Sequence, residues 1–146
     1  MTILIINGPN LNLLGTREPT IYGNKSYEDL KTDLQTHAKK LAMTIDIYQT
    51  NFEGIIIDLM HHAHHKPYDA IIINGAALSH YSYAIVDAIS AIDIPVINVH
   101  LTDPLKRKES FRHTDVIALA SEITFKGKGF NSYIDALDYI NTHLKK

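Results

Sequence analysis

The stretch from Asn7 to Gly23 contains side chains that could carry out acid–base chemistry. Arg17 lies five residues before Tyr22, and Asn10 lies earlier in the same stretch. A free tyrosine has a pKa near ~10, so ionisation at neutral pH requires a shift of about three units, or roughly 4 kcal/mol. An arginine, which keeps its charge, is one of the few groups that supply such a shift. Asn10, Arg17 and Tyr22 could therefore serve polar chemistry in this stretch.

The same stretch is predicted to form a loop, because glycines and prolines recur along it. At about seventeen residues it is longer than an ordinary connection between a strand and a helix, and loops of this length are usually functional or disordered. Leu11, Leu13 and Leu14 argue against disorder, because a solvated loop gains nothing from three leucines. We interpret the stretch as a packed active-site lid. The structural alternative is that Tyr22 only anchors a loop onto the core.

Short apolar segments alternate with helix-like segments along the chain. Strands are predicted at residues 3–6, 44–49, 70–73, 95–99 and 116–120. Helices are predicted from the capping-box-like Ser26-Tyr-Glu-Asp29 onward and at residues 55–65, 81–92 and 132–144. This alternation predicts an α/β fold of three layers, in which helices cover both faces of a flavodoxin-like, doubly wound, five-stranded parallel sheet.

Length and composition restrict the possible functions. The 146 residues suggest one domain, residues 1–146, with enough chain for a proper core. The absence of cysteine excludes disulfides, thiol catalysis and Cys-ligated zinc. A net charge of -2 does not favour nucleic acid or an anionic membrane surface. No signal peptide is visible and no apolar run approaches the ~20 residues that span a bilayer, so we expect a cytoplasmic protein.

Polar clusters follow the predicted strands. In doubly wound sheets, ligands bind beyond the carboxyl ends of the strands, so we expect these clusters to converge on one crevice. They are Asn10 to Tyr22, Asn51 with Glu53, Asn74 to His80, and His100 to Asp103. Histidine suits acid–base work because its ordinary pKa lies near working pH, which makes His100 a candidate acid.

These motifs resemble those of type II 3-dehydroquinate dehydratase. The resemblance starts with Asn7-Gly-Pro-Asn-Leu-Asn-Leu-Leu-Gly15, Arg17-Glu-Pro19 and Tyr22-Gly23, and continues in order at residues 49–54, 74–82, 99–101 and 111–113. It implies a hydro-lyase of the shikimate pathway, which converts 3-dehydroquinate to 3-dehydroshikimate by anti elimination through an enolate. The family uses neither a Schiff base nor a metal, so the resemblance implies no cofactor.

The resemblance also implies a role for each matching residue. Tyr22 would remove the C2 proton, and Arg17 would stabilise its phenolate. Asn10 would help hold the water that supports the enolate, and His100 would protonate the departing hydroxyl. The substrate's carboxylate and hydroxyls would be bound by Asn74, His80, Arg112 and the backbone amides of Leu101 and Thr102.

The family assembles as dodecamers made of trimers, and the resemblance implies the same assembly here. Asp87 would then complete the site of a neighbouring subunit.

One departure from the family pattern concerns the acid. Family members usually carry glutamate two residues before this histidine, where the present chain has Asn98. Asparagine can orient the imidazole of His100 but brings no full negative charge. We therefore expect Asn98→Glu to move the high-pH limb of the pH–turnover profile upward, and by less if Asp103 or Glu53 lies close.

Two other segments also depart from the pattern. The usual Asn-Pro-Gly or Asn-Ala-Gly appears as Asn74-Gly75-Ala76, which predicts an altered local turn without displacement of His80. Residues 102–110 replace a Ser-Asn-led segment and are about one residue longer than the family pattern. We expect the charges of residues 106–109 to form solvated surface.

Residues 61–65 offer a possible metal site, because His61 and His65 share a helix face at i, i+4 spacing. No glutamate lies between them in the metalloprotease pattern, and imidazoles at a helix end complement the helix dipole. We interpret this cluster as surface.

The competing functions are a small-ligand-binding or signalling module on the same fold and a dehydratase-like homologue with weak activity. A flavodoxin would need a phosphate loop rich in hydroxyls and glycine after the first strand, whereas Asn7-Gly-Pro-Asn-Leu-Asn12 is apolar and rich in amides. A phospho-receiver would need a pair of acidic residues there. The fold alone does not separate these functions.

Overall fold

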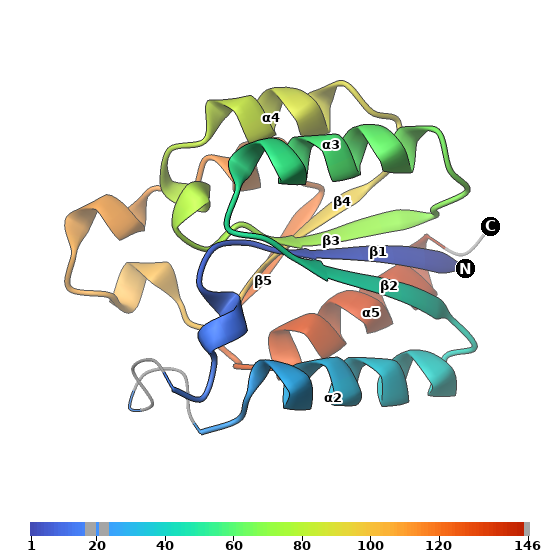
Figure 1. Ribbon diagram of the computed structural model, residues 1–146, viewed down its shortest axis with the longest axis horizontal. Coiled ribbons are helices and arrows are strands. Elements are labelled where there is room, and N and C mark those ends of the chain that lie inside the picture. Colours follow the sequence, from blue (N-terminus) through green and yellow to red (C-terminus); the bar gives the residue numbers. More distant parts are fainter. Residues whose placement is uncertain (17–19, 21–23, 145–146) are drawn as a thin grey trace.

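The computed structural model describes residues 1–16, 20 and 24–144. Within these residues, five parallel strands form one sheet in the order β2-β1-β3-β4-β5 (Figure 1). The strands are β1 Thr2–Asn7, β2 Thr44–Gln49, β3 Ala70–Asn74, β4 Val96–His100 and β5 Ile123–Lys126. The flavodoxin-like order predicted from the sequence is confirmed.

Helices cover both faces of the sheet. In Figure 1, α2 (Tyr27–Lys40) and α5 (Asn131–His143) lie on one face, and α3 (Glu53–His64) and α4 (Tyr83–Ser90) lie on the other. Successive residues of β1 therefore enter different cores: Ile3 and Ile5 pack with α2 and α5, whereas Leu4 and Ile6 pack with α3 and α4. This explains why the strand is wholly apolar rather than alternating.

The helix α2 begins as its sequence predicts. The Oγ of Ser26 accepts a hydrogen bond from the Asp29 amide at 3.1 Å, and the Asp29 carboxylate accepts one from the Ser26 amide at 2.8 Å. This reciprocal capping box satisfies two amides that have no partner inside the helix.

No helix among residues 1–16 and 24–144 is long and apolar enough to cross a membrane.

The fifth strand is not at residues 116–120, and that prediction is wrong. Ile117–Leu119 form a short 3-10 turn, η5, in which the amide of Ala118 donates to Asp115 Oδ1 at 3.2 Å. Val116 and Ile117 are buried in the core on the α4 side. A short apolar run has no periodicity that separates a buried turn from a buried strand. The true edge strand β5 is only partly buried and gives a weaker signal.

Helix α4 begins later than predicted because another 3-10 helix, η2 (Ala76–His80), precedes it. The Oγ of Ser82 accepts a hydrogen bond from the Ile85 amide at 3.1 Å and fixes the start of α4. Three further short 3-10 helices lie at the same end of the sheet: η1 Leu11–Leu13, η3 Pro104–Lys106 and η4 Ser110–His113.

The ends of β1 and β3 are joined where the strand order reverses. The amide of Gly8 donates to the carbonyl of Asn74 at 2.8 Å, and a Cβ on Gly8 would lie 2.6 Å from the Gly75 carbonyl oxygen. Only glycine allows this approach. Beneath it, the hydroxyl of buried Tyr133 donates to Asn7 Oδ1 at 2.6 Å and accepts from Asn74 Nδ2 at 2.9 Å. One tyrosine of α5 thus satisfies an amide group from each strand.

Removal of this hydroxyl tests its contribution. Tyr133→Phe should lower the free energy of unfolding by about 1–3 kcal/mol, because two buried amide groups lose a partner while the ring keeps its packing. The measurement is urea denaturation. Tyr139→Phe on the same helix is the matched control, because the Tyr139 hydroxyl bonds Glu122 at a solvent-accessible position and its loss should matter by less than about 0.5 kcal/mol. Equal losses in both variants would contradict the assigned role.

The turn after β3 places Ala76 in the left-handed region, with φ of 49°. That conformation costs an alanine about 1–2 kcal/mol, whereas glycine adopts it freely but loses about 0.5–1 kcal/mol more backbone entropy. Ala76→Gly should therefore raise the free energy of unfolding by up to about 1.5 kcal/mol. Ala84→Gly, inside helix α4, should lower it by about 1 kcal/mol. A loss of stability in both variants would show that the turn is unstrained.

Candidate active site

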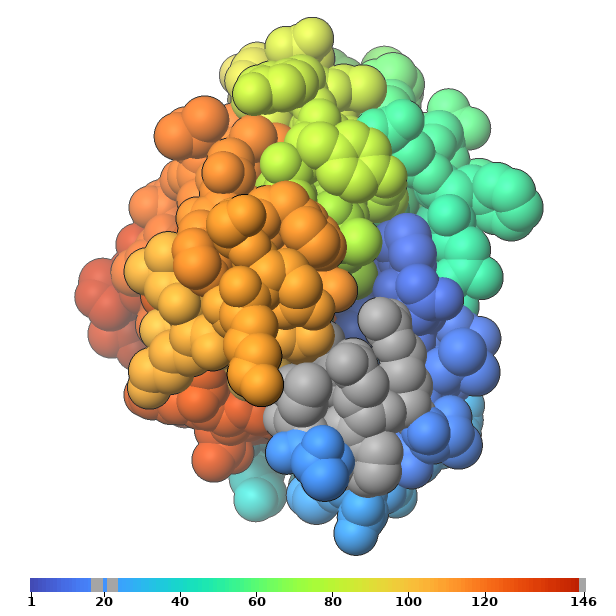
Figure 2. Space-filling model, turned by 90° about the vertical axis from the view of Figure 1, so that its left-hand side faces the viewer, coloured from blue at the N-terminus to red at the C-terminus, as the bar shows by residue number. Residues whose placement is uncertain are grey.

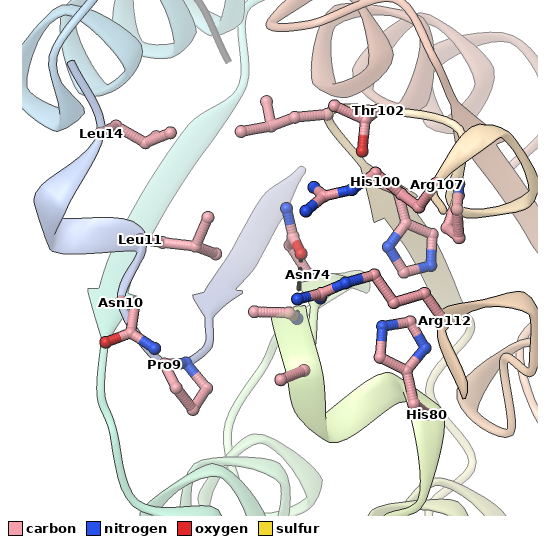
Figure 3. Close-up of a pocket in the computed structure, with 14 residues that line it drawn as sticks. Pro9, Asn10, Leu11, Leu14, Asn74, His80, His100, Thr102, Arg107 and Arg112 are labelled. Carbon is pink, nitrogen blue, oxygen red and sulfur yellow. Dashed lines mark hydrogen bonds between the residues drawn. The ribbon is translucent and has the colours of Figure 1, made fainter. Parts of the chain in front are cut away.

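A pocket with a volume of about 110 Å³ opens beyond the carboxyl ends of β1, β3 and β4 (Figure 3). Figure 2 views the molecule from this end, where residues 102–115 (orange), the segment after β3 (yellow-green) and the loop after β1 (blue) are exposed. The lining residues are Pro9, Asn10, Leu11, Leu14, Asn74, Ala76, Ala77, His80, His100, Leu101, Thr102, Pro104, Arg107 and Arg112.

Most of the site residues predicted from the sequence lie in this pocket. Three segments far apart in the chain supply Asn10, Asn74 with His80, and His100 to Arg112. Asp87 is absent from the lining and is exposed on α4. Arg17 and Tyr22 lie outside the described residues.

The polar cluster after β2 does not reach the pocket, which corrects the expectation that all the clusters converge. Asn51 Oδ1 instead accepts hydrogen bonds from the Asn10 amide at 3.0 Å and from Gln49 Nε2 at 3.1 Å. Asn10 has φ of 68°, so this contact holds a left-handed residue at the pocket rim. The Glu53 carboxylate bonds the hydroxyl of Ser82 and ties the starts of α3 and α4 together.

Asn74 is fixed inside the fold on one side and faces the pocket on the other. Its Oδ1 accepts from the Ala76 amide at 3.1 Å and its Nδ2 donates to Tyr133. The side chain therefore helps to end β3, and it also lines the pocket. Each amide atom keeps capacity for a second hydrogen bond.

His80 has its ring orientation set by the segment after η4. Its Nδ1 lies 2.7 Å from the carbonyl oxygen of Thr114. A carbonyl only accepts, so Nδ1 carries the proton and Nε2 of the neutral ring can accept a hydrogen bond. The ring also meets Phe111 edge-on, with centroids 5.8 Å apart. His80 lines the pocket.

Two guanidinium groups line the pocket. Arg112 Cζ lies 4.8 Å from the Phe111 ring centroid, a cation–π contact, and its Nε lies 3.3 Å from Glu109 Oε1. Arg107 Nη2 lies 3.7 Å from the same carboxylate oxygen. Arginine binds carboxylates in a bidentate fork, so a pocket lined by two arginines suits an anionic ligand.

Arg107 is a site residue that sequence reasoning missed. Residues 106–109 were expected to be solvated; Lys106, Lys108 and Glu109 are exposed, but the side chain of Arg107 is only 10% exposed. A signal was present, because the chain contains only three arginines, at positions 17, 107 and 112. A chain that uses lysine for most surface charge and keeps arginine for a few positions indicates where bidentate binding is needed.

His100 lies against a carboxylate that the sequence did not indicate. Its Nε2 is 2.7 Å from Asp115 Oδ2, and Asn98 Nδ2 donates to the same oxygen at 2.8 Å. The expected sources of charge are occupied elsewhere, since Asp103 pairs with Lys126 at 3.1 Å and Glu53 bonds Ser82. A full negative charge therefore lies next to His100, and it comes from Asp115 rather than from Asp103 or Glu53.

The surroundings of Asp115 keep it ionised. Burial by itself raises the pKa of this carboxyl, but the hydrogen bond and charge of His100 outweigh that effect, with help from Asn98 and the Ala118 amide. The pKa of Asp115 consequently lies below its ordinary value.

The backbone beyond β4 offers free donors. Among the described residues, none accepts a hydrogen bond from the amides of Leu101 or Thr102, whereas the Leu101 carbonyl accepts from Gly129 at 2.8 Å. Both residues line the pocket. Adjacent backbone amides that lack an acceptor in the fold can bind an anion.

The histidines at residues 61–65 lie at the end of α3, and all four are exposed. Among residues 1–16 and 24–144 no group of three or more histidine, cysteine or acidic side chains is arranged to hold a metal ion.

Comparison with known proteins gives consistent matches. The family "Dehydroquinase class II" matches residues 1–141. The 3-dehydroquinate dehydratase of Caldicellulosiruptor bescii is 50% identical over 135 residues, 92% of both chains, and that of Clostridium perfringens is 45% identical over 99% of both. The crystal structure of the type II dehydroquinase from Butyrivibrio crossotus superposes with a TM-score of 0.95 at 43% identity, covering 97% of this chain and 98% of that one. This chain belongs to the class II dehydroquinase family.

Proposed function

We propose that this protein is a type II 3-dehydroquinate dehydratase, which converts 3-dehydroquinate to 3-dehydroshikimate in the shikimate pathway. The observation that carries the proposal is the pocket, where Asn10, Asn74, His80, His100 and Arg112 meet from separate segments. These are the residues that the family motifs assign, and relatives that carry this name match nearly the whole chain.

Substrate binding follows from the donors and acceptors in the pocket. The carboxylate of 3-dehydroquinate is bound by the free amides of Leu101 and Thr102, with Arg112 supplying positive charge. The hydroxyls are bound by Asn74, whose amide has spare capacity, and by the acceptor Nε2 of His80. Arg107 adds a second cation beside the carboxylate site.

The elimination needs a base and an acid at opposite ends of the substrate. Tyr22, held as phenolate by Arg17, removes the C2 proton, and the electron pair passes into the neighbouring carbonyl as an enolate. A water held by Asn10 supports the enolate oxygen. The enolate then expels the hydroxyl, which takes a proton from His100 and leaves as water, so that the new double bond is conjugated with the carbonyl. No metal or organic cofactor takes part.

A homo-oligomer built from trimers, and a dodecamer of four such trimers, is part of the proposal. Phe52, Tyr81 and Tyr83 are 61–68% exposed, and the Glu53–Ser82 hydrogen bond brings the segments that carry them together. Exposed apolar side chains gathered in this way mark interaction surfaces. Asp87 lies one turn after Tyr83 on the same helix, so a subunit packed on this face would receive its carboxylate.

Residues 1–146 act as one dehydratase domain in this proposal, and the cytoplasmic location expected from the sequence stays a prediction.

A binding module without catalysis would need none of the acid–base pairs described above. It is separated from the enzyme by one measurement. The conjugated enone of the product absorbs in the ultraviolet and the substrate does not, so purified protein mixed with 3-dehydroquinate should give a steady rise in absorbance.

The assignment of Tyr22 makes a specific prediction for that assay. Tyr22→Phe keeps the aromatic ring but removes the group that takes the proton, so turnover should fall by about 10²–10⁴-fold. The variant should unfold at the same temperature as the parent protein. Tyr48→Phe, at an exposed position on the edge strand β2, is the matched control and should retain full turnover. Near-normal turnover in Tyr22→Phe would refute the assignment.

The assembly has its own test. Asp87→Ala should reduce turnover and weaken the trimer together, as measured by the assay and by light scattering on the same sample. Asp93→Ala changes an exposed carboxylate just after the same helix and should alter neither. A parent protein that is monomeric and fully active would rule out a shared site.

A further inference from the structure

We propose that Asp115 is the positioning residue that holds His100 as a protonated imidazolium, with Asn98 as its hydrogen-bond donor, in place of the glutamate that the family usually carries at position 98. The inference rests on the proposed function for its catalytic meaning. The arrangement of the three side chains stands on the structure alone.

The geometry around Asp115 consists of one acceptor and three donors. Its Oδ2 lies 2.7 Å from His100 Nε2 and 2.8 Å from Asn98 Nδ2, and its Oδ1 accepts the Ala118 amide at 3.2 Å. The His100 side chain is 7% exposed and that of Asp115 is 18% exposed, so water screens their contact weakly. A carboxylate at this distance favours the charged imidazole and fixes the plane of its ring.

The presence of Asp115 explains why position 98 carries an amide. A glutamate there would place a second carboxylate against Asp115, where the Asn98 nitrogen now donates. Two carboxylates in contact cannot both stay ionised without a large cost. Asn98 Nδ2 also donates to Thr124 Oγ1 at 3.2 Å, which directs its amide group toward Asp115. Positions 98 and 115 are therefore coupled. A carboxylate at one of these positions requires a hydrogen-bond donor at the other.

The remaining charges around His100 do not replace this contact. Arg107 and Arg112 line the same pocket, and their positive charges disfavour a further cation there. Lys126 is the register neighbour of His100 on β5 and pairs with Asp103. Among the described residues, Asp115 is thus the carboxylate in direct contact with His100, and it offsets these cations.

The free nitrogen of His100 is the one available for catalysis. Nε2 is engaged by Asp115, while Nδ1 has no hydrogen-bond partner among the described residues, and the ring lines the pocket. A proton on Nδ1 can then pass to a departing hydroxyl. Until that transfer the imidazole ring is positively charged, and Asp115 stabilises this charge through its contact with Nε2. This division of roles is how a buried carboxylate orients a catalytic histidine.

The first test needs no substrate. The pH at which the His100 imidazole loses its proton can be followed by NMR, with the His100→Gln spectrum used to assign its signal among the nine histidines. In Asp115→Asn this pH should fall, because the amide that replaces the carboxylate 2.7 Å from His100 Nε2 brings no charge. Asp103→Asn removes a nearby carboxylate that does not contact His100, and it should leave the titration of His100 unchanged.

The second test follows turnover against pH at saturating substrate. Asp115→Asn should move the high-pH limb to lower pH and reduce turnover near neutral pH by about tenfold. The exchange variant Asn98→Asp/Asp115→Asn returns one carboxylate and one amide to the cluster, because Asn98 Nδ2 lies 3.5 Å from His100 Nε2. It should restore the position of the limb. Asn98→Glu alone should lower stability and turnover rather than raise the limb, since Asp115 remains in place.

The outcomes separate the possible explanations. An unchanged His100 titration in folded Asp115→Asn, checked by circular dichroism, would overturn the proposal. So would an equal loss of turnover at every pH, which is what a purely structural role predicts, or a folded exchange variant with no recovery. If 3-dehydroquinate gives no turnover with the parent protein, the NMR titration still decides the role of Asp115, so failure of the proposed function and failure of this inference remain distinct.

Discussion

The contact between the loops after β1 and β3 is the constraint on which the site depends. Gly8 approaches Asn74 and Gly75 so closely that a single Cβ would collide with a carbonyl oxygen. Tyr133 then holds the amide side chains at both strand ends from below. Because the strand order reverses between β1 and β3, the chain leaves in opposite directions above this contact, and the opening is the pocket.

The outer wall of the pocket is built differently. The segment from Thr102 to Asp115 has little regular structure and is held by side chains: Phe111 lies between His80 and Arg112, and Asp115 binds His100. Short 3-10 turns and a cation–π contact hold this wall in place, whereas the sheet holds the opposite wall. Few backbone hydrogen bonds constrain this wall, so it depends on side-chain contacts more than the strands do.

The carboxylate that contacts His100 belongs to Asp115, which lies outside the strand that carries Asn98. From β4 alone, asparagine in place of glutamate indicates a weaker acid. The carboxylate instead comes from the turn before η5, seventeen residues later in the chain, and Asn98 becomes its donor. Chemistry at a site depends on which groups surround the reacting atom, whatever strand or loop supplies them.

The sequence by itself determined the features that depend on local patterns. Apolar runs bounded by breakers located four of the five strands, the Ser26–Asp29 pattern located the start of α2, and the alternation of elements indicated the sheet order. The motif residues at strand ends were placed in one crevice because parallel strands deliver their carboxyl ends to the same edge. Only the tertiary structure decided the conformation of residues 116–120, the entry of Arg107 into the pocket and the pairing of Asp115 with His100. Each of these depends on contacts between segments distant in the chain, and neither hydrophobic periodicity nor local spacing records which distant group fills a position.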